Sequence, residues 1–505
     1  MVELQAVIVG AGFSGLCAGI QLRKAGIESF VILEKGQGVG GTWRDNTYPG
    51  AACDIPSHLY SYSFEPNPSW SRAYGGQPEI LAYLEHCATK YGLRPHLRLG
   101  AQVVAASYDD RAATWTVRTH GGEVYVARTL VLGNGALHLP AIPELPGAST
   151  FAGTTFHSAR WRHDHDRAGR KVAVIGTGAS TIQFVPQIAP KVDQLHVFQR
   201  TPPWIVPKAD RPIGSRERWM LEHIPGAHWL RRTGLYWLFE SRVRGFAFAP
   251  LINKLAEKLV LKHLRAQVPD PDLRAQLTPA YRMGCKRVLI SNDYYPALGR
   301  DNVDLVPAGI QAIEPRGIRT TDGVLHEADT IIYGTGFKVV DYVASMKITG
   351  SGGRELGDVW ATESVRNYLG ISVSGFPNLM LLMGPNTGLG HNSMIFMIEA
   401  QVRYMVEAIK AMRANDLAAI DVKPEVEQAF RAELQHKLEG TVWTSGCNSW
   451  YMAPGGDVLL WPGFTFEYWK RTRTIRLADY RLQALVRAHT VGPRSDLTLE
   501  SAAAI

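Results

Sequence analysis

A glycine-rich turn follows the first apolar run of the chain and has the residue types needed to hold phosphate groups. The run 7–9 leads into Gly10, Gly12 and Gly15, spaced as GxGxxG, and a helical pattern begins directly after them. Gly10 allows a tight turn, Gly12 lets the backbone approach a pyrophosphate, and Gly15 lets the helix pack closely on the strand. Phosphates would lie at the helix N-terminus, where free N–H groups and the positive end of the helix dipole attract anions.

A carboxylate follows this turn at the position that faces the ribose of a bound dinucleotide. The next apolar run, 30–33, ends at Glu34, at about the spacing at which a carboxylate accepts hydrogen bonds from both ribose hydroxyls. A carboxylate at this place would repel a 2′-phosphate. The first site should therefore hold FAD or NAD rather than NADP.

A second turn of the same kind carries the opposite charge. The run 172–175 leads into Gly176 and Gly178, and Thr181 takes the place of the third glycine, which predicts slightly looser packing of the helix. The strand after this helix is followed by Arg200, whose permanent charge and forked donors suit a 2′-phosphate. The second site should therefore take NADPH, and by elimination the first takes FAD.

Length and charge limit the kinds of protein that this chain can be. Its 505 residues are too many for one core and fit two or three domains. No run of 18 apolar residues occurs, so we expect no membrane-spanning helix, and the first strand begins too early to leave room for a signal peptide. The net charge of +8 suits a protein that holds two polyanionic cofactors, and the lack of a dense Lys/Arg run argues against nucleic acid as a partner.

The cysteines are five in number, scattered, and without a CxxC pair. This pattern predicts neither a zinc site nor a redox-active dithiol. No His/Asp/Glu cluster has the spacing of metal ligands either, so we expect no bound metal. We expect reduced cysteines and a cytoplasmic location.

The elements that position these motifs are predicted to form an α/β fold with two Rossmann-like dinucleotide-binding domains and an inserted helical segment. Within the insertion, the amphipathic stretch 235–264 has two interpretations: it lies on a membrane, or it packs on its own protein. The expected bounds are 1–150 and 338–505 for a discontinuous FAD-binding domain, 151–207 and 285–337 for the NADP-binding domain, and 208–284 for the helical insertion.

Three further motifs resemble those of type I Baeyer–Villiger monooxygenases, a group within the class B flavoprotein monooxygenases. Residues 151–161 fit the pattern FxGxxxHxxxW, although Arg162 stands where this family has Pro or Asp. Residues 40–54 carry GGxWxxNxYPGxxxD intact, and 334–337 match a third element, with Gly334 where Ala is commoner. The resemblance covers nearly the whole chain.

This resemblance implies a reaction in two halves. NADPH gives a hydride to FAD, and the reduced flavin reacts with O₂ to form a C4a-peroxide that converts a ketone to an ester or lactone. Lys286 and Arg287 match the lysine–arginine pair of the family, in which the Lys assists the NADP phosphate and the Arg lies over the flavin. An Arg suits an anionic oxidant because it cannot donate its proton at working pH. Asp54 would accept a hydrogen bond from Arg287 or flank the nicotinamide.

Other residues of these motifs have structural or mixed interpretations. His157 and Trp161 are expected to link the two domains and to sense the bound cofactor. Trp43 and Tyr48 are expected to form a wall beside the flavin ring, and for Tyr48 plain core packing is the alternative. Residues 391–393 open a long helix whose N-terminus could face the flavin, and an ordinary Ser/Asn cap is compatible with that role.

The expected site therefore has Arg287 and Asp54 as catalytic residues. Its pocket walls are expected from the inserted helices, from 291–295 and from the aromatic-rich segment 443–461, which suggests a bulky or apolar ketone. The expected cofactor-binding residues are Gly10, Gly12, Phe13, Ser14, Gly15, Glu34, Lys35, Gly41, Thr42, Trp43, Asp54, Tyr60, Val103, Gly176, Gly178, Ala179, Ser180, Arg200, Thr201, Lys286 and Arg287.

Two other functions compete with Baeyer–Villiger oxidation. One is an N- or S-hydroxylating flavin monooxygenase, or a long-chain hydroxylase, with the same cofactors. Trp161 argues against it, because those enzymes usually carry another aromatic residue there, and Arg287 argues against it because a soft nucleophile needs no cation beside the oxidant. The other is a non-catalytic flavin or NADP sensor, against which the intact Lys286, Arg287 and Asp54 argue.

Overall fold

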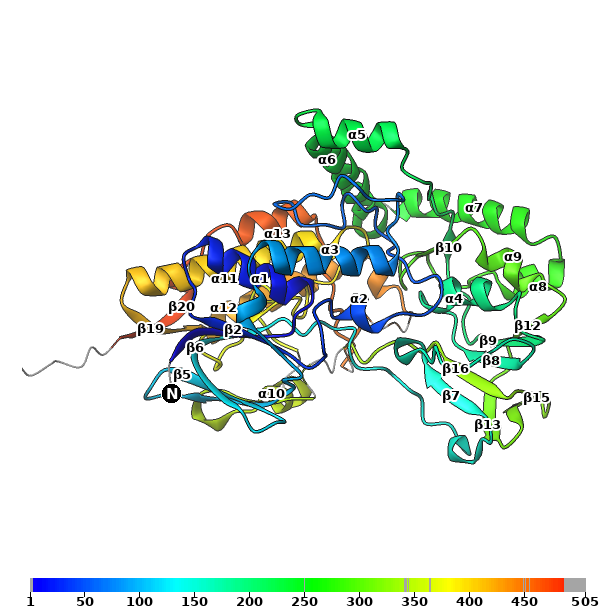
Figure 1. The fold of residues 1–505 in the computed structure, drawn as a ribbon, viewed down its shortest axis with the longest axis horizontal. Coiled ribbons are helices and arrows are strands. Elements are labelled where there is room, and N and C mark those ends of the chain that lie inside the picture. Colours follow the sequence, from blue (N-terminus) through cyan, green and yellow to red (C-terminus); the bar gives the residue numbers. More distant parts are fainter. Residues whose placement is uncertain are drawn as a thin grey trace, which may run out of the picture.

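The computed structural model describes residues 3–485 except 249, 340–342, 344, 363–364, 448, 450 and 454. Two sheets lie side by side in Figure 1, and each contains one of the glycine turns. The fold is α/β with two Rossmann-like units, as the sequence predicts. The ends of the predicted FAD-binding domain, 1–2 and 486–505, lie outside the described residues.

The first sheet has eight strands in the order β17-β4-β5-β6-β1-β2-β3, with β18 paired to β6. The strands β17 and β18 come from much later in the chain than the others, so the chain returns to this sheet after building the second one. The bounds are β1 (Leu4–Val9), β2 (Phe30–Glu34), β3 (Leu97–Leu99), β4 (Val103–Asp109), β5 (Thr114–Thr119), β6 (Val124–Leu132), β17 (Lys347–Thr349) and β18 (Leu379–Leu381).

The central strand β1 is apolar from Ala6 to Val9, where both of its faces are buried. Ala6 and Ile8 face a core that includes the helices α1 and α11, whereas Val7 and Val9 face a second core on the other side. The helices associated with this sheet are α1 (Phe13–Lys24), α2 (Thr42–Asp45), α3 (Gln77–Lys90), α10 (Leu356–Thr362), α11 (Met394–Ala414), α12 (Pro424–Leu438) and α13 (Thr465–Arg471).

The second sheet has five strands, all parallel, in the order β12-β9-β8-β16-β7. The second glycine turn joins β8 to α4, in the same way that the first joins β1 to α1. The bounds are β7 (Thr154–His157), β8 (Lys171–Ile175), β9 (Gln194–Phe198), β12 (Val303–Val306), β16 (Thr330–Tyr333), α4 (Thr181–Ile188) and α9 (Tyr294–Leu298). Three small sheets complete the β structure: β10 (Ile205–Val206) with β11 (Leu289–Ile290), β13 (Ile310–Glu314) with β14 (Gly317–Thr320) and β15 (Leu325–Glu327), and β19 (Leu417–Val422) with β20 (Tyr480–Ala484).

The two chain segments that connect the sheets lie next to each other. Pro140 and Phe337 form an isolated β-bridge, and the Ala141 N–H donates to the Gly336 carbonyl at 2.9 Å. The proline-rich stretch that follows the first sheet is therefore paired with the segment that leads back to it.

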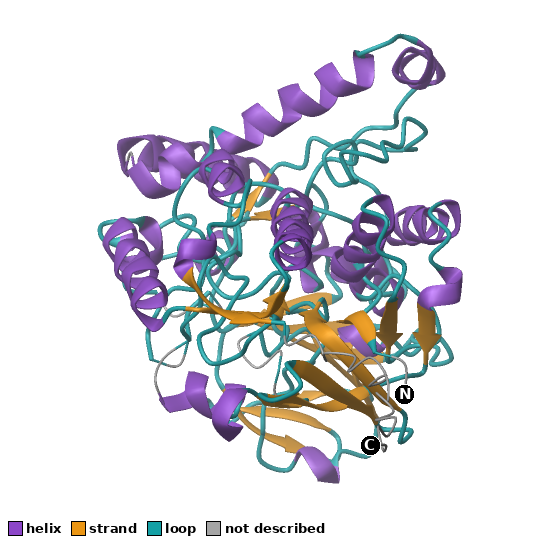
Figure 2. Ribbon diagram, turned by 90° about the vertical axis from the view of Figure 1, so that its left-hand side faces the viewer, coloured by secondary structure: helices purple, strands orange, loops and turns teal. Residues whose placement is uncertain are grey.

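The inserted segment is helical, and its later part packs on the second unit, because Leu264 belongs to the same core as Val172 and Leu195. Figures 1 and 2 place its helices α5 and α6 at the top of the molecule, away from the strands. Among the described residues, no helix is long and apolar enough to cross a bilayer. The bounds are α5 (Ser215–His223), α6 (Ala227–Glu240), a π-helical turn η4 (Arg244–Phe248), α7 (Pro250–Gln267) and α8 (Pro271–Gln276).

The missing third glycine of the second turn is compensated elsewhere. Thr181 is fully buried, and a Cβ added to Gly334 would lie only 2.1 Å from the Thr181 Oγ1. Gly334, directly after β16, has no side chain, and this leaves room for the side chain of Thr181. The two residues therefore pack closely, and Thr181 does not loosen the contact between the helix and the sheet.

Replacing Gly334 with alanine should lower the free energy of unfolding by about 1–3 kcal/mol, since the added methyl group overpacks this contact. The double variant G334A/T181A, which also removes the Thr181 hydroxyl, should recover most of that loss. Denaturant unfolding of the two variants and of T181A alone measures the coupling. Additive effects in the double variant would contradict this account of the pair.

The expectation that all cysteines stay reduced is wrong for one pair. Cys285 and Cys447 form a disulfide across a sequence separation of 162 residues, with a Cα–Cα distance of 6.2 Å. No spacing rule can reveal a pair that distant, because only the fold brings the two residues together. Cys17, Cys53 and Cys87 are free and buried.

Candidate active site

A cavity of about 1370 Å³ lies between the two glycine turns. It is lined by residues from both units, and its walls include every predicted site residue except Gly15. Across the described residues, no group of His, Cys, Asp and Glu side chains could hold a metal ion. The residues that line the cavity come from segments that are separated by up to several hundred positions in the sequence.

The two turns present their backbones to this cavity in the same way. Gly10 and Gly176 have φ angles of +96° and +106°, and a Cβ on either would lie within 2.7 Å of a carbonyl oxygen of the neighbouring crossover. At Gly12 and Gly178, by contrast, a Cβ would meet no protein atom closer than 3.7 Å and 3.9 Å. The bare backbone at these two positions leaves space for a pyrophosphate at each helix N-terminus, so both turns fit a dinucleotide.

Gly15 lies behind the first turn and does not face the cavity. A Cβ there would lie 1.8 Å from the Gly10 carbonyl oxygen. Its role is the close contact of helix and turn that the sequence pattern predicts.

Glu34 closes β2 at the edge of the cavity and is 4% exposed. One carboxylate oxygen accepts a hydrogen bond from the Ala11 N–H at 2.8 Å, and the other accepts from the Gly36 N–H at 2.8 Å. Arg44 pairs with the same carboxylate at 2.9 Å. These three contacts fix the carboxylate in place and leave about one lone pair, on Oε2, for a ribose hydroxyl. Arg44 was not predicted, because nothing in its local sequence marks it as a partner of Glu34.

Two cations lie close together beside the second glycine turn. Arg200 is exposed at the cavity, and Lys286 and Thr201 line the same region. Burial lowers the pKa of Lys286, and the nearby Arg200 charge lowers it further. Neither cation forms an ion pair with a described carboxylate. Two like charges held together without an acid between them form a site for an anion of more than one charge.

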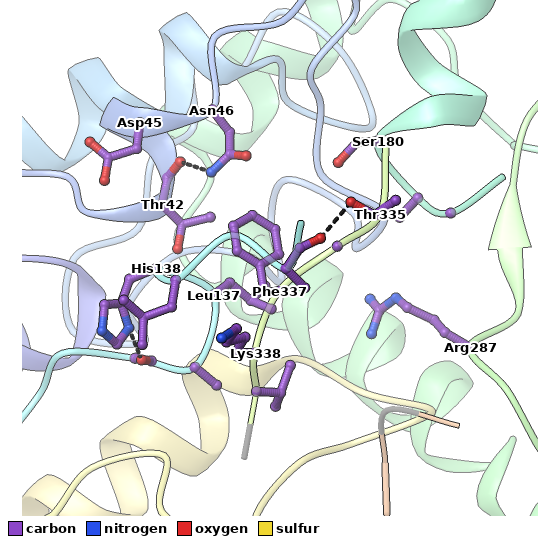
Figure 3. Close-up of a pocket in the computed structure, with 18 of the residues that line it drawn as sticks. Thr42, Asp45, Asn46, Leu137, His138, Ser180, Arg287, Thr335, Phe337 and Lys338 are labelled. Carbon is purple, nitrogen blue, oxygen red and sulfur yellow. Dashed lines mark hydrogen bonds between the residues drawn. The ribbon is translucent and has the colours of Figure 1, made fainter. Parts of the chain in front are cut away.

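Arg287 and Asp54 meet although they are 233 residues apart in the sequence. The Arg287 Nε donates to the Asp54 Oδ2 at 2.9 Å, and Nη2 donates to the same oxygen. The Asp54 carboxylate raises the pKa of Arg287 still further above its ordinary value. Figure 3 shows Arg287 pointing into the cavity from the side opposite Thr42 and His138. The result is a fixed cation that faces the cavity and is held by one carboxylate.

Tyr451 completes the surroundings of this pair, and sequence reasoning did not find it. The residue is buried and lines the cavity. Burial raises the pKa of Tyr451, and the Arg287 charge opposes that rise, which places the phenol beside the guanidinium.

Aromatic side chains form the wall around the first turn. The Trp43 Nε1 donates to the Tyr60 hydroxyl at 3.1 Å, and the Phe13 and Tyr60 rings are 5.2 Å apart. Tyr48 both lines the cavity and packs, because its hydroxyl donates to the Gln183 Oε1 of α4 at 3.0 Å. The two interpretations of Tyr48 are therefore compatible.

The N-terminus of α11 also faces the cavity. Ser393 caps this helix by accepting a hydrogen bond from the Ile395 N–H at 3.3 Å, and Asn392 and Met394 line the cavity beside it. The Asn392 Nδ2 donates to Glu240 at 2.7 Å. The last residue of α6 thus holds the side chain that precedes the helix.

Glu240 is buried and accepts several hydrogen bonds. Its carboxylate accepts from the Thr465 hydroxyl at 2.8 Å as well as from Asn392, and His391 Nε2 lies 3.6 Å away. Burial alone would raise the pKa of Glu240, but the contacts with His391, Asn392 and Thr465 lower it below its ordinary value.

Replacing Glu240 with glutamine should lower the free energy of unfolding by about 1–3 kcal/mol at neutral pH, because an amide group then meets donors it cannot satisfy. A carboxyl whose pKa is lowered by folding stabilises the protein above its unfolded pKa and loses this effect as the pH falls through the folded pKa. The difference between the wild type and E240Q should therefore shrink in acid. Denaturant unfolding at several pH values measures it, and a constant difference would contradict the assignment.

His157 and Trp161 lie outside the cavity walls. Trp161 packs on Phe184 at 5.2 Å between ring centroids, and Phe184 packs on Tyr48 at 6.0 Å. The His157 ring contacts Phe337, which belongs to the crossing between the sheets. Both residues thus contact the junction of the two units, where a linking role was predicted.

The expected pocket walls are only partly present. No described residue of the helices α5–α8 and none of 291–295 lines the cavity. The segment 443–461 does contribute Tyr451, Leu459 and Leu460. The loops after β6 and β16, which include His138 and Thr335, also line it and were not predicted; the Thr335 hydroxyl donates to the Ala141 carbonyl at 2.5 Å.

Two dinucleotide turns that open onto one cavity, with a carboxylate beside the first and cations beside the second, are typical of flavin-dependent oxidoreductases of the two-dinucleotide class. Residues 7–213 match the family model described as pyridine nucleotide-disulphide oxidoreductase. The chain is 47% identical to a Baeyer–Villiger monooxygenase of Pseudomonas aeruginosa, over 94% of this chain and 90% of that protein.

Solved structures agree with this result. A steroid monooxygenase bound to NADP is 32% identical with a TM-score of 0.86, and the match covers 96% of this chain and 100% of that one. A structure titled OTEMO in complex with FAD and NADP is 29% identical with a TM-score of 0.87, over 95% of this chain and 99% of that one. The chain belongs to the Baeyer–Villiger monooxygenase family, and it is a monooxygenase.

Proposed function

We propose that this monooxygenase binds FAD at the first glycine turn and NADPH at the second, and that it converts an apolar ketone to an ester or lactone with O₂. The observation that carries the proposal is the Arg287 guanidinium, which is held by Asp54 at 2.9 Å and faces the cavity between the two turns. An oxidation of soft nucleophiles would need no such cation.

The residues present fit both cofactors. The open backbone at Gly12 and the carboxylate of Glu34 would hold the phosphates and ribose of FAD, in a domain formed by 1–150 and 338–505. Gly178, Arg200, Thr201 and Lys286 would hold NADPH, in a domain formed by 151–207 and 285–337. When bound and reduced, the flavin supplies the activation of O₂.

The protein's own residues have three tasks in this reaction. Arg287 stabilises the negative charge that develops on the oxygen atom being transferred, since its charge is permanent and it keeps its protons. Asp54 keeps the guanidinium oriented and is therefore a positioning group as well as a wall of the cavity. The buried Tyr451 and the partly buried Tyr60 help to exclude water from the reacting atoms.

The substrate class follows from the remaining walls. Leu389, Leu459, Leu460 and Met383 line the cavity and offer no charge to a ligand. We therefore propose a ketone with a largely apolar body. The requirement for NADPH supports a cytoplasmic location.

Purification and a product assay test this function. The protein should be yellow, should release one FAD per chain on denaturation, and should oxidise NADPH faster when a suitable ketone is added. Gas chromatography should then find the corresponding ester or lactone. A colourless protein that takes up no flavin would overturn the proposal, and so would NADPH-dependent oxidation of amines or sulfides with no ester from any ketone of a cyclic, linear and aryl panel.

A further inference from the structure

The inserted segment exposes an unusual amount of apolar surface. Twelve large apolar side chains between 219 and 259 are at least 45% exposed, whereas the six other exposed ones are scattered over the rest of the described chain. We call these twelve residues the insertion face: Trp219, Met220, Ile224, Trp229, Leu230, Trp237, Leu238, Phe248, Leu251, Ile252, Leu255 and Leu259. Contiguous exposed apolar surface of this kind marks an interaction site.

The helix α7 shows how this surface is organised. Leu251, Leu255 and Leu259 are four residues apart and are 75%, 64% and 70% exposed, so they form one ridge along the helix. A second ridge with the same spacing consists of three exposed lysines, Lys254, Lys258 and Lys262.

The carboxylate of α7 points away from both ridges. Glu257 accepts a hydrogen bond from the Met283 N–H at 2.9 Å, on the protein side of the helix. The outer side of α7 therefore combines apolar and basic side chains only.

Ring contacts join α6 to η4, the turn that precedes α7. Trp237 of α6 lies 6.2 Å from Phe466, Phe466 lies 5.2 Å from Phe464, and Phe464 stacks on Phe248 at 5.6 Å between centroids. The apolar surface of α6 is thus continuous with that of η4 through the start of α13. Both ribbon views place α5 and α6 at one end of the molecule, clear of the strands that form the cavity.

The charge of the insertion decides what this surface fits. Residues 215–267 contain ten Lys and Arg and four Glu, which gives this segment a net charge of +6. The whole chain has a net charge of +8, so about a tenth of its residues carries most of the positive surplus. Two of those glutamates, Glu240 and Glu257, are engaged on the inner side. A second copy docked on the same face would bring like charges together, whereas an anionic partner would neutralise them.

We infer that the insertion face docks on the surface of an anionic lipid bilayer. The leucine ridge would lie among the acyl chains near the headgroups and the lysine ridge among the lipid phosphates, as in helices that lie in the membrane interface. The three exposed tryptophans, Trp219, Trp229 and Trp237, suit the same depth, since their rings are apolar with one polar edge. The protein would rest on the bilayer without crossing it.

Vesicle sedimentation with the flavin-loaded, full-length protein tests this inference. We expect binding to phosphatidylcholine vesicles that contain about one third phosphatidylglycerol, and at least about tenfold weaker binding to pure phosphatidylcholine. Added salt should weaken the binding.

Two triple variants separate the apolar and the basic contributions. L251S/L255S/L259S and K254Q/K258Q/K262Q should each weaken binding to the anionic vesicles by about tenfold or more, with flavin content and activity in free solution unchanged. The matched control L99S/V324S/L482S removes three exposed apolar side chains elsewhere and should bind like the wild type.

Three results would overturn the inference. One is equal binding to both kinds of vesicle, and another is binding that survives the leucine triple variant. The third is the absence of vesicle binding together with a concentration-dependent dimer, seen by sedimentation velocity, that the leucine variant abolishes, since the face would then be a contact between copies of this chain.

Discussion

Replacing Arg287 with alanine should leave NADPH oxidation by the holoenzyme running while ester formation falls by at least about a hundredfold. The guanidinium faces the cavity and is held at 2.9 Å by Asp54, so it offers a fixed charge where negative charge develops during oxygen transfer. Hydride transfer from NADPH needs no such charge. Parallel measurement of NADPH consumption and of ester by gas chromatography gives the ratio of the two.

The conservative variant R287K is the control for charge alone. Lysine keeps the positive charge but lacks the forked donors that reach Asp54 through two nitrogens, so we expect partial ester formation, between that of the alanine variant and the wild type. An alanine variant that couples NADPH to ester as well as the wild type does would show that Arg287 is not the catalytic cation.

Removing both cations beside the second glycine turn should raise the KM for NADPH by at least about a hundredfold, since each charge-assisted hydrogen bond to a phosphate contributes about 1.5–3 kcal/mol. Arg200 and Lys286 both line the cavity, and the Arg200 charge is close enough to lower the pKa of Lys286. The KM for NADH, which lacks the 2′-phosphate, should change little in R200Q/K286Q. Steady-state kinetics with both nucleotides measures the preference.

The surface variant K191Q/R300Q is the control, because it removes two charges from the same unit outside the cavity. Its KM for NADPH should match that of the wild type. If R200Q/K286Q raised the KM for NADH and NADPH equally, the two cations would not recognise the 2′-phosphate.

The sequence was sufficient for the parts of the site that depend on local pattern. The two glycine turns, Glu34 and Arg200 each follow directly from an apolar run, and the structure places all of them at one cavity. The turn geometry is set by a few consecutive residues, so a short motif carries the information. The same reasoning located the central strands and the long helix that begins near Ser393.

The rest depends on contacts between distant segments. The pairing of Arg287 with Asp54 could be expected only from the resemblance to a family, and Arg44, Glu240 and Tyr451 have no pattern of their own. The disulfide of Cys285 with Cys447 joins residues that spacing rules treat as unrelated. Side chains that act across 100 residues or more are visible only after the fold has brought them together.

The contact between Thr181 and Gly334 shows why single motifs can mislead. Taken alone, Thr181 is a departure from the glycine pattern and predicts looser packing. Gly334 is a second departure from the family pattern, and it provides the space that Thr181 needs. A Cβ added to Gly334 would lie only 2.1 Å from the Thr181 hydroxyl oxygen. Two departures that look like defects in separate motifs compensate each other across one contact.

The central claim is that the cavity between the two turns transfers one oxygen atom of O₂ next to the carbonyl carbon of a ketone. Turnover of the purified enzyme with NADPH and an accepted ketone under ¹⁸O₂ tests it most directly, with mass spectrometry of the product. The account predicts one ¹⁸O atom per ester or lactone, at the bridging oxygen, and none from labelled water. A product without the label, or label only in hydrogen peroxide while the ketone is recovered unchanged, would contradict it.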